Sequence, residues 1–525
     1  MPKPDHNTPG VYIEEISFDA HSVVPLPTAV PAFIGYTPKA SHNGVSFFDK
    51  AIRISSFAEF QAFYCLENSM PQTPAKQYSP QYYLVEQKPG VDYINSLAIN
   101  GKDYAVLPDP NTIYYLYNSI RLFYENGGRD AYIVSVGTYG PPSGKPLQPG
   151  APLVNPNVLL NDLLGGISLL KKVQEPTMYI CPEATLLNVG NNGNLMQEML
   201  LQNAEKRTAI SIFDLIGAKY PDPVLFSNDI QTFRNNTGVN GLSYGAAYYP
   251  FVSTTIMQPT DLDFNNFFGG QTNKLKALLS PADAPNSAAV EIFAKINNPD
   301  TKALPQQLQA ALLLVSPEYK DILNLALEDA NLLPPSGGMA GIMTMVDNQT
   351  GVWKAPANIS MVGVKGLTIN LNENQQSGLN VDAVSGKSIN AIRNFTGRGI
   401  LVWGARTLDG NSLDWKYIPV RRTMIFIEQS CKMATQAYVF EPNDQNTWNA
   451  VKSMIENFLI NLWKQGGLSG AKPSHAFAVQ CGLGSTMTAQ DIQESNLIVH
   501  IQVALVRPAE FITFSFSQKM TAPLP

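Results

Sequence analysis

Residues 440–468 of the chain have the sequence FEPNDQNTWNAVKSMIENFLINLWKQGGL. From Trp448 to Leu462 the apolar side chains recur at the three-, four- and seven-residue spacing of one helix face. Asp444 or Asn446 can cap the start of such a helix, and the glycines at 466–467 can end it. The stretch predicts a helix over 445–465 that packs into a core, with a stripe wide enough to place one edge against a partner.

Three other segments alternate between apolar and polar residues as β-strands do. One follows the helix at 496–506, the pattern resumes at 512–517, and the third lies at 11–16. The two terminal segments have no obvious partner strand in the chain, and a lone strand exposes unpaired backbone donors and acceptors. Donation to neighbouring subunits would satisfy these groups, and chains that both donate and accept form rings or open helices.

The composition describes a large globular protein with an unusually uncharged surface. The 525 residues suggest roughly two to four domains. Charged residues make up 15%, against about 25% in an average globular protein. The net charge of −6 gives no whole-chain attraction to nucleic acid, and 44% hydrophobic residues argue against disorder. A surface with few charges is typical of a protein that contacts other subunits.

The sequence also excludes several locations and kinds of site. No run of apolar residues is long enough to span a membrane, and the N-terminus lacks the apolar region of a secretory signal. The cysteines are widely scattered, which fits neither a disulfide framework nor a zinc site and indicates a reducing cytoplasm. They are Cys65, Cys181, Cys431 and Cys481.

The remaining pattern predicts a mixed α+β or α/β fold. The prolines of 22–31 indicate an extended linker that leads into a buried strand at 32–36. Further strands are expected at 131–136, 178–181, 246–254 and 400–403, and 210–213 and 422–428 fit either a strand or part of a helix. Helices are expected at 55–67, 112–125, 195–218 and within 280–350, where Ser280-Pro281 and Ser316-Pro317 are candidate helix starts. Residues 137–157 are expected to form a loop.

Enzyme-like motifs are weak. Residues 241–245 (GLSYG) match the G-x-S-x-G pattern of serine hydrolases, but no apolar strand precedes Ser243 and a strand pattern follows it, so a glycine-rich turn is favoured. The Asp261-x-Asp263 pair lacks the other ligands of a calcium loop, and the glycines at 337–341 lack the Lys-Ser/Thr of a phosphate loop. Five arginines of the C-terminal third are expected in structural ion pairs or interfaces: Arg393, Arg398, Arg406, Arg421 and Arg422. We therefore predict no enzyme activity, catalytic residue, metal or cofactor.

Several long blocks resemble contractile tail sheath proteins of phages and of phage-tail-like injection systems, in family order along the chain. They are TPGVYIEE (8–15), GVWKAPAN (351–358), INAIRNFTGRGILVWGARTL (389–408), WKYIPVRRTMIFIEQS (415–430), residues 440–468 and VRPAEFI (506–512). Residues 158–340 resemble the family weakly, chiefly at YGAAYYPF (244–251).

The resemblance implies a multidomain protein with an inner α/β core shared by the family, terminal extended β arms and a more variable outer α/β domain. It implies an N-terminal arm at 1–21, the N-terminal part of the core at 22–150 and the outer domain at 151–350. The C-terminal sheath domain would occupy 351–505 and the C-terminal arm 506–525. In such proteins stacked six-fold rings surround an inner tube and contract to drive the tube through a target envelope.

The resemblance also implies roles for particular residues. The helix 445–465 would face the tube through Lys452, Glu456 and Lys464, and hinges at Pro25, Pro27, Arg507 and Pro508 would absorb rotation. The residues expected to pair with neighbouring subunits are Val11, Tyr12, Ile13, Glu14, Ile512, Phe514 and Phe516.

The implied partners are further copies of the chain, the inner tube protein, and baseplate and cap proteins, without nucleic acid contact or membrane insertion. Assembly is expected in the bacterial cytoplasm, and release of the particle from the cell is left open. Two alternatives remain, a baseplate or cap component of the same kind of particle and, remotely, a serine hydrolase that uses Ser243.

Overall fold

The computed structural model describes residues 22–68, 74–88 and 95–511, and the chain divides into two compact units. The described part of the smaller unit comprises 22–26 and Phe426–Val506. The larger unit takes the described residues from Pro27 to Ile425, together with 507–511. The chain passes between the units three times: at 26/27, inside helix α12 (Ile418–Thr435) and at 506/507.

The larger unit contains an eight-stranded sheet with the order β16-β15-β11-β10-β9-β1-β8-β4. The six inner strands run parallel, while β16 and β4 are antiparallel edge strands. The strands are β1 (Pro31–Tyr36), β4 (Ala51–Ile54), β8 (Ala131–Gly137), β9 (Met178–Ile180), β10 (Ile210–Asp214), β11 (Gly245–Tyr249), β15 (Asn390–Phe395) and β16 (Gly399–Trp403). Every residue of β1, β9, β10 and β11 is buried, because parallel strands are covered by helices on both faces.

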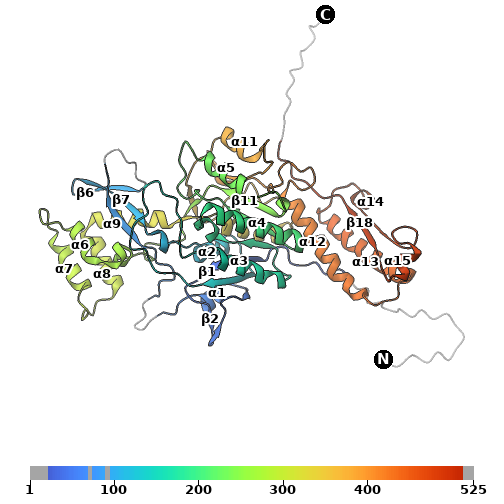
Figure 1. Ribbon diagram of the computed structural model, residues 1–525, viewed down its shortest axis with the longest axis horizontal. Coiled ribbons are helices and arrows are strands. Elements are labelled where there is room, and N and C mark those ends of the chain that lie inside the picture. Colours follow the sequence, from blue (N-terminus) through green and yellow to red (C-terminus); the bar gives the residue numbers. More distant parts are fainter. Residues whose placement is uncertain (1–21, 69–73, 89–94, 512–525) are drawn as a thin grey trace, which may run out of the picture. The chain divides into compact units, whose positions relative to one another are not determined.

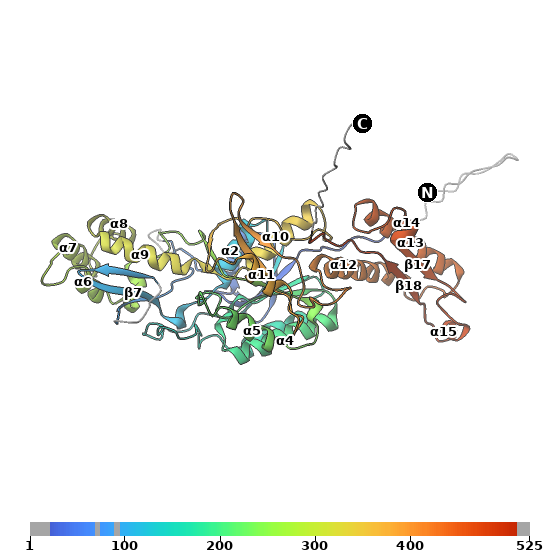
Figure 2. The same cartoon turned by 90° about the horizontal axis from the view of Figure 1, so that it is seen from above.

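Successive residues of β1 show which helices cover which face. Phe33 packs on Phe123 of α2 (Leu116–Glu125), with 5.3 Å between ring centroids. The next residue, Ile34, points to the opposite face and meets Gly166 of α3 (Leu160–Leu169). Figure 2 shows α2 and α10 (Ser336–Gln349) on one side of the sheet, and α4 (Val189–Lys206) and α5 (Ser227–Asn236) on the other.

Helices α2 and α10 approach each other closely because α10 carries glycines one turn apart. A Cβ atom on Gly337 would lie 2.5 Å from the Ser119 carbonyl oxygen, and one on Gly341 would lie 2.5 Å from the Phe123 carbonyl oxygen. The glycine cluster that lacked the features of a phosphate loop therefore has a packing role.

The remaining elements of the larger unit form smaller groups. Strands β5 (Tyr82–Glu86), β7 (Lys102–Pro108) and β6 (Ser96–Ile99) make one sheet, and α9 (Pro317–Ala330) packs against it. Helices α6 (Thr272–Leu279), α7 (Ser287–Ile296) and α8 (Pro305–Val315) join α9 in a helical cluster (Figure 1). The other elements are β2 (Ser41–His42), β3 (Val45–Ser46), α1 (Phe57–Tyr64), β12 (Val252–Thr254), β13 (Leu332–Leu333), β14 (Val364–Leu367) and α11 (Glu373–Asn380).

The smaller unit is built on α13 (Gln445–Lys464), which packs against the antiparallel pair β17 (Phe477–Cys481) and β18 (Val499–Val503). The short helices α14 (Pro473–Ala476) and α15 (Ala489–Gln493) and the second half of α12 complete it.

Most sequence-based expectations for single elements are confirmed. The expected strands at 32–36, 131–136, 178–181 and 400–403 are β1, β8, β9 and β16, and the helix at 445–465 is α13. The ambiguous segment 210–213 is strand β10, whereas 422–428 lies in helix α12. Ser316 caps α9 and Pro317 is its first residue, as predicted.

Three expectations were wrong, at least in part. The helix expected at 195–218 ends at Lys206 of α4, and strand β10 follows it. Ser280-Pro281 does not start a helix, because the Ser280 hydroxyl accepts a hydrogen bond from the Asn286 N–H and Asn286 caps α7 instead. The single strand expected at 246–254 is divided into β11 and β12, which join different sheets on either side of Pro250, a residue without a backbone donor.

Two carboxyl groups of the larger unit are buried at the starts of helices α2 and α10. Glu183 Oε1 accepts hydrogen bonds from the N–H groups of Leu116 (2.8 Å) and Tyr115 (3.3 Å) at the start of α2. Asp214, at the end of β10, accepts one from the Ser336 N–H at the start of α10 (2.9 Å). Burial raises the pKa of each carboxyl to about 7, although these hydrogen bonds oppose the shift.

We predict that Glu183→Gln makes the stability of the chain less dependent on pH. A folded-state pKa of about 7 against 4.5 means that this carboxyl's favourable contribution is complete below pH 4.5 and is lost as the pH rises through 7. The shift corresponds to about 3 kcal/mol over that window. Urea unfolding at pH 5 and pH 8 should show a smaller loss for Glu183→Gln than for the wild type, and Glu494→Gln, at an exposed glutamate, should behave as the wild type. Equal losses in all three proteins would contradict the prediction.

Candidate functional site

Helix α13 is held at both ends by the groups that its sequence predicted. The Asp444 carboxylate accepts hydrogen bonds from the N–H groups of Asn446 and Thr447, both at 3.0 Å. After the helix, the N–H groups of Gly466 and Gly467 donate to carbonyls of its last turn. The predicted apolar stripe is buried: Trp448, Val451, Ile455, Phe458, Leu459 and Leu462.

The outward face of α13 is mostly uncharged. Lys452 and Glu456 lie on its flank, with 3.9 Å between Nζ and Oε1 and with 43% and 36% of their side chains exposed, so their attraction is weak. Lys464 is exposed in the last turn. The helix also carries exposed amides and a serine, which the sequence-based prediction did not single out: Asn446, Asn449, Ser453, Asn457 and Asn461.

A groove of about 410 Å³ runs beside α13 in the smaller unit. Phe426, Met454, Phe458 and Leu462 supply its apolar wall, and the Phe426 and Phe458 ring centroids are 5.7 Å apart. Lys464 and two of the amides lie at its polar rim, and the segment 22–25 lines it as well. Lys464, one of the two lysines expected to face the tube, therefore lies next to an apolar surface. Its charge alone does not suggest this position.

The β17–β18 pair is a two-stranded sheet whose strands match Phe477 with Val503 and Cys481 with Val499. Backbone hydrogen bonds next to the strands extend the pairing. The Ala504 N–H donates to the Ala476 carbonyl, and the Ser469 N–H donates to the Ala504 carbonyl. No third strand joins this sheet within the described ranges. The strand predicted at 496–506 is thus confirmed as β18, and β17, a run of only five residues, was not anticipated.

The expected arm-pairing residues lie outside the described residues, in 1–21 and 512–525, so their role stays a prediction. The expected hinge residues lie where the two units meet along the chain. Pro25 belongs to the smaller unit and Pro27 to the larger, while Arg507 and Pro508 are the first residues after the 506/507 boundary. Hinge motion at these positions also stays a prediction.

Glu510 is a residue that the sequence-based prediction missed, although it lies in the block VRPAEFI. Its carboxylate accepts hydrogen bonds from Arg406 Nε (2.9 Å) and Nη2 (2.6 Å), from the Asn380 amide (3.0 Å) and from the Tyr417 hydroxyl (3.1 Å). Burial alone would raise its pKa, but these donors outweigh burial and lower it. An ion pair between Arg406 and Glu510 is a contact that no local periodicity indicates, because 104 positions separate them.

The enzyme-like motif forms a turn, as expected. Ser243 lies in a 3-10 turn directly before β11, and Arg421 Nη2 donates to its hydroxyl at 3.0 Å. Arg421 also stacks on Trp415, at 3.6 Å from the ring centroid. Arg422 pairs with Asp347 at 2.7 Å, which confirms the expected structural ion pair.

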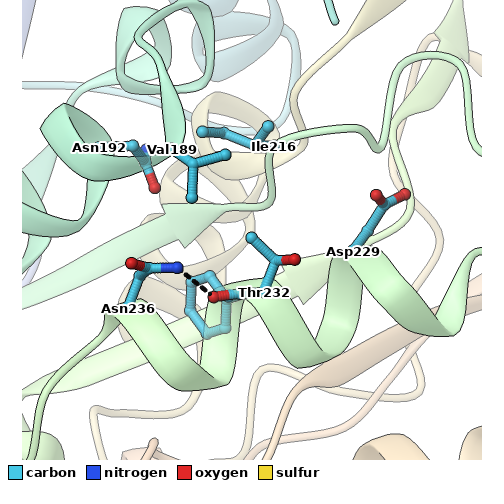
Figure 3. Close-up of a pocket in the computed structure, with 7 residues that line it drawn as sticks. Val189, Asn192, Ile216, Asp229, Thr232 and Asn236 are labelled. Carbon is cyan, nitrogen blue, oxygen red and sulfur yellow. Dashed lines mark hydrogen bonds between the residues drawn. The ribbon is translucent and has the colours of Figure 1, made fainter. Parts of the chain in front are cut away.

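Figure 3 shows a cavity between α4 and α5 where Asp229, Thr232 and Asn236 of α5 face Val189 and Asn192 of α4. The Asn236 amide donates to the Thr232 carbonyl at 2.8 Å, and burial raises the pKa of Asp229 to about 6. The volume of about 10 Å³ suffices for a single water molecule and is too small for a substrate.

Other groups in the described part of the chain were compared with known kinds of site. No cluster of three or more His, Cys, Asp or Glu side chains there is arranged to hold a metal ion. The four cysteines are free thiols. None of the helices in the described ranges has the length and hydropathy needed to cross a bilayer.

Parts of the sequence are similar to known tail sheath proteins. Residues 411–519, which include α13, β17, β18 and Glu510, match the family model of the phage tail sheath C-terminal domain. The tail sheath protein of Vibrio phage KVP40 is 26% identical over 187 residues, or 35% of this chain and 26% of that protein. The tail sheath protein of Burkholderia phage BcepMu is 29% identical over 146 residues, or 27% and 30% of the two chains. The matches therefore span less than a third of either relative.

Similarity in three dimensions extends over nearly the whole chain. A chain in the baseplate of the anti-feeding prophage (AFP) is 25% identical, with a TM-score of 0.57 over 98% of this chain and 100% of that one. The AFP helical sheath in its contracted state is also 25% identical, with a TM-score of 0.56 and the same coverage. The chain is similar in sequence and fold to contractile tail sheath proteins. The contracted sheath of an extracellular contractile injection system, PVC, shows the same fold at 24% identity and a TM-score of 0.57, over 98% of this chain and 99% of that one.

Proposed function

We propose that this chain is the structural subunit of a contractile sheath. It would polymerise as stacked six-fold rings around an inner tube and contract to drive the tube through a target envelope. The observation that carries the proposal is the match of the whole fold to the AFP sheath, together with the match of 411–519 to the tail sheath C-terminal domain. The proposed organisation keeps an inner core and terminal arms. Residues 151–350, expected as a separate outer domain, supply β9, β10 and β11 to the middle of the eight-stranded sheet.

The β17–β18 pair supports assembly by strand exchange. Among the described residues neither β17 nor β18 has a second partner strand, and an extended segment of another chain can pair with such an edge. The terminal arms at 11–16 and 512–517 carry the alternating pattern that such pairing needs. Because each copy would donate arms and accept others, the contact is heterologous and propagates along a ring or helix.

The outward face of α13 supports a breakable contact with the tube. Its exposed lysines and amides can form polar contacts with a partner, and exposed ionic contacts contribute only about 0–1 kcal/mol each. A tube held in this way stays attached at rest and slides free on contraction. The further partners in the proposal are baseplate and cap proteins.

A second candidate is a baseplate component, because one structural relative is a chain of the AFP baseplate. Such a component would remain a discrete oligomer at high protein concentration. Negative-stain electron microscopy of the chain expressed alone and with its tube protein separates the candidates. Striated hollow tubes are expected for a sheath subunit, and small closed rings in both preparations would favour the baseplate component.

Deletion of residues 1–15, or of residues 511–525, is expected to abolish ordered sheath tubes because each deletion removes one arm. Deletion of only residues 1–7 leaves Val11–Glu14 in place and serves as the control. The measurement is the number of tubes per micrograph at matched concentration. Tubes of normal length and number from either long deletion would contradict the arm-exchange proposal.

Charge reversal of both Lys452 and Lys464 to Glu is expected to reduce sheath formation on preformed tubes several-fold, since the proposed tube contact loses its positive charges. The fold should stay intact because both side chains are partly or fully exposed. Lys432→Glu, at an exposed position of α12, is the matched control. Unchanged decoration of tubes by the double variant would remove this face of α13 from the tube interface.

A further inference from the structure

The C-terminal segment returns to the larger unit after the chain has completed the smaller one. Residues up to Val506 belong to the smaller unit, and 507–511 belong to the larger. Two contacts of charged side chains hold this short segment. Arg507 pairs with Asp414 at 3.6 Å, but 53% and 77% of these side chains are exposed, so that pair contributes little. Glu510 makes the second contact.

The Glu510 contact has the features of a strong ion pair. Arg406 presents Nε and Nη2 to the carboxylate, the paired geometry that strengthens Arg–carboxylate contacts. Only 5% of the Arg406 side chain and 21% of the Glu510 side chain are exposed, so water screens the pair weakly. The Asn380 amide and the Tyr417 hydroxyl donate to the same carboxylate, which satisfies its remaining acceptor sites.

The partners of Glu510 are themselves fixed to the large sheet. The Arg406 N–H donates to the Asn390 side-chain oxygen at 2.8 Å, and the Asn390 amide donates to the Arg406 carbonyl at 2.8 Å. Asn390 is the first residue of β15, and its amide also donates to the Ala247 carbonyl of β11 at 3.1 Å. A continuous series of hydrogen bonds thus runs from Glu510 through Arg406 to two neighbouring strands.

We propose that Glu510 is the anchor of the C-terminal arm and fixes the base of that arm to the sheet of the larger unit. The inference rests on the proposed strand exchange, and it adds a mechanical consequence. The β18 edge that would accept an arm belongs to the smaller unit, whereas the base of the donated arm belongs to the larger unit. Tension on an exchanged arm therefore passes from the smaller unit of the acceptor, through Glu510 and Arg406, into the central sheet of the donor. The donor's own smaller unit lies outside this path of the C-terminal arm.

The first test measures the anchor itself, without polymerisation. Chymotrypsin cleaves after Phe511, which is exposed, but the protease must also accommodate the preceding residues in an extended form, and this requires release of Glu510. Glu510→Ala in the full-length, dispersed chain should be cleaved there about tenfold faster or more, as expected for loss of a charge-assisted contact of low exposure. Glu494→Ala, at an exposed glutamate of the smaller unit, should be cleaved at the wild-type rate.

Asn380→Ala removes only one donor to the Glu510 carboxylate. It should also raise the cleavage rate, but by a smaller factor than Glu510→Ala does. It keeps the test informative if Glu510→Ala fails to fold, which circular dichroism would reveal. Cleavage at the wild-type rate in the folded variants would overturn the anchor.

The second test measures the mechanical consequence. Tubes assembled from Glu510→Ala should come apart at a lower urea concentration than wild-type tubes, whereas those from Glu494→Ala should match the wild type. Equal urea resistance of the Glu510→Ala and wild-type tubes would overturn the tension path. If the wild-type chain forms no tubes even with its tube protein, the proposed function is contradicted. The cleavage rates would still show whether Glu510 anchors residues 507–511.

Discussion

Backbone hydrogen bonding is the constraint on which both units depend, since each strand must pair on two edges or leave donors and acceptors open. The inner strands of the main sheet in the larger unit meet it within that unit. Its six parallel strands lie between helices and end in the antiparallel edges β4 and β16. The smaller unit meets it only in part, because β17 and β18 pair with each other and the sheet ends there within the described residues. Among the described residues, six strands of the larger sheet therefore have a partner on both sides, whereas β17 and β18 have only each other.

The path of the chain determines how the smaller unit is connected to the larger one. The smaller unit is inserted between Ile425 and Arg507 and also takes residues from the start of the chain. Two of its three connections contain the prolines that were expected to act as hinges, and the third is the continuous helix α12. Glu510 lies just beyond the last connection and is bonded to Arg406. Residues 507–511 are therefore fixed to the larger unit and not to the inserted one.

Buried polar groups have a different role in the larger unit, where they fix its helices. Glu183 and Asp214 cap α2 and α10, the same helices that the glycines of α10 bring into close contact. Each carboxyl is removed from water and keeps its position through backbone N–H groups, so its charge is costly and its geometry is specific. Such groups give the core a defined arrangement in addition to its apolar packing.

The sequence by itself determined those elements whose cause is local. The stripe from Trp448 to Leu462 and the Asp444 cap predicted α13, because periodicity and capping act within a few residues. Alternation predicted β18, and the family blocks predicted the sheath fold. Tertiary structure alone decided which strand lies beside β18, that Gly337 and Gly341 are packing residues and that 422–428 is helical. It also decided that Glu510 meets Arg406 across 104 positions, because such contacts depend on how distant segments pack and leave no periodic signal in the chain.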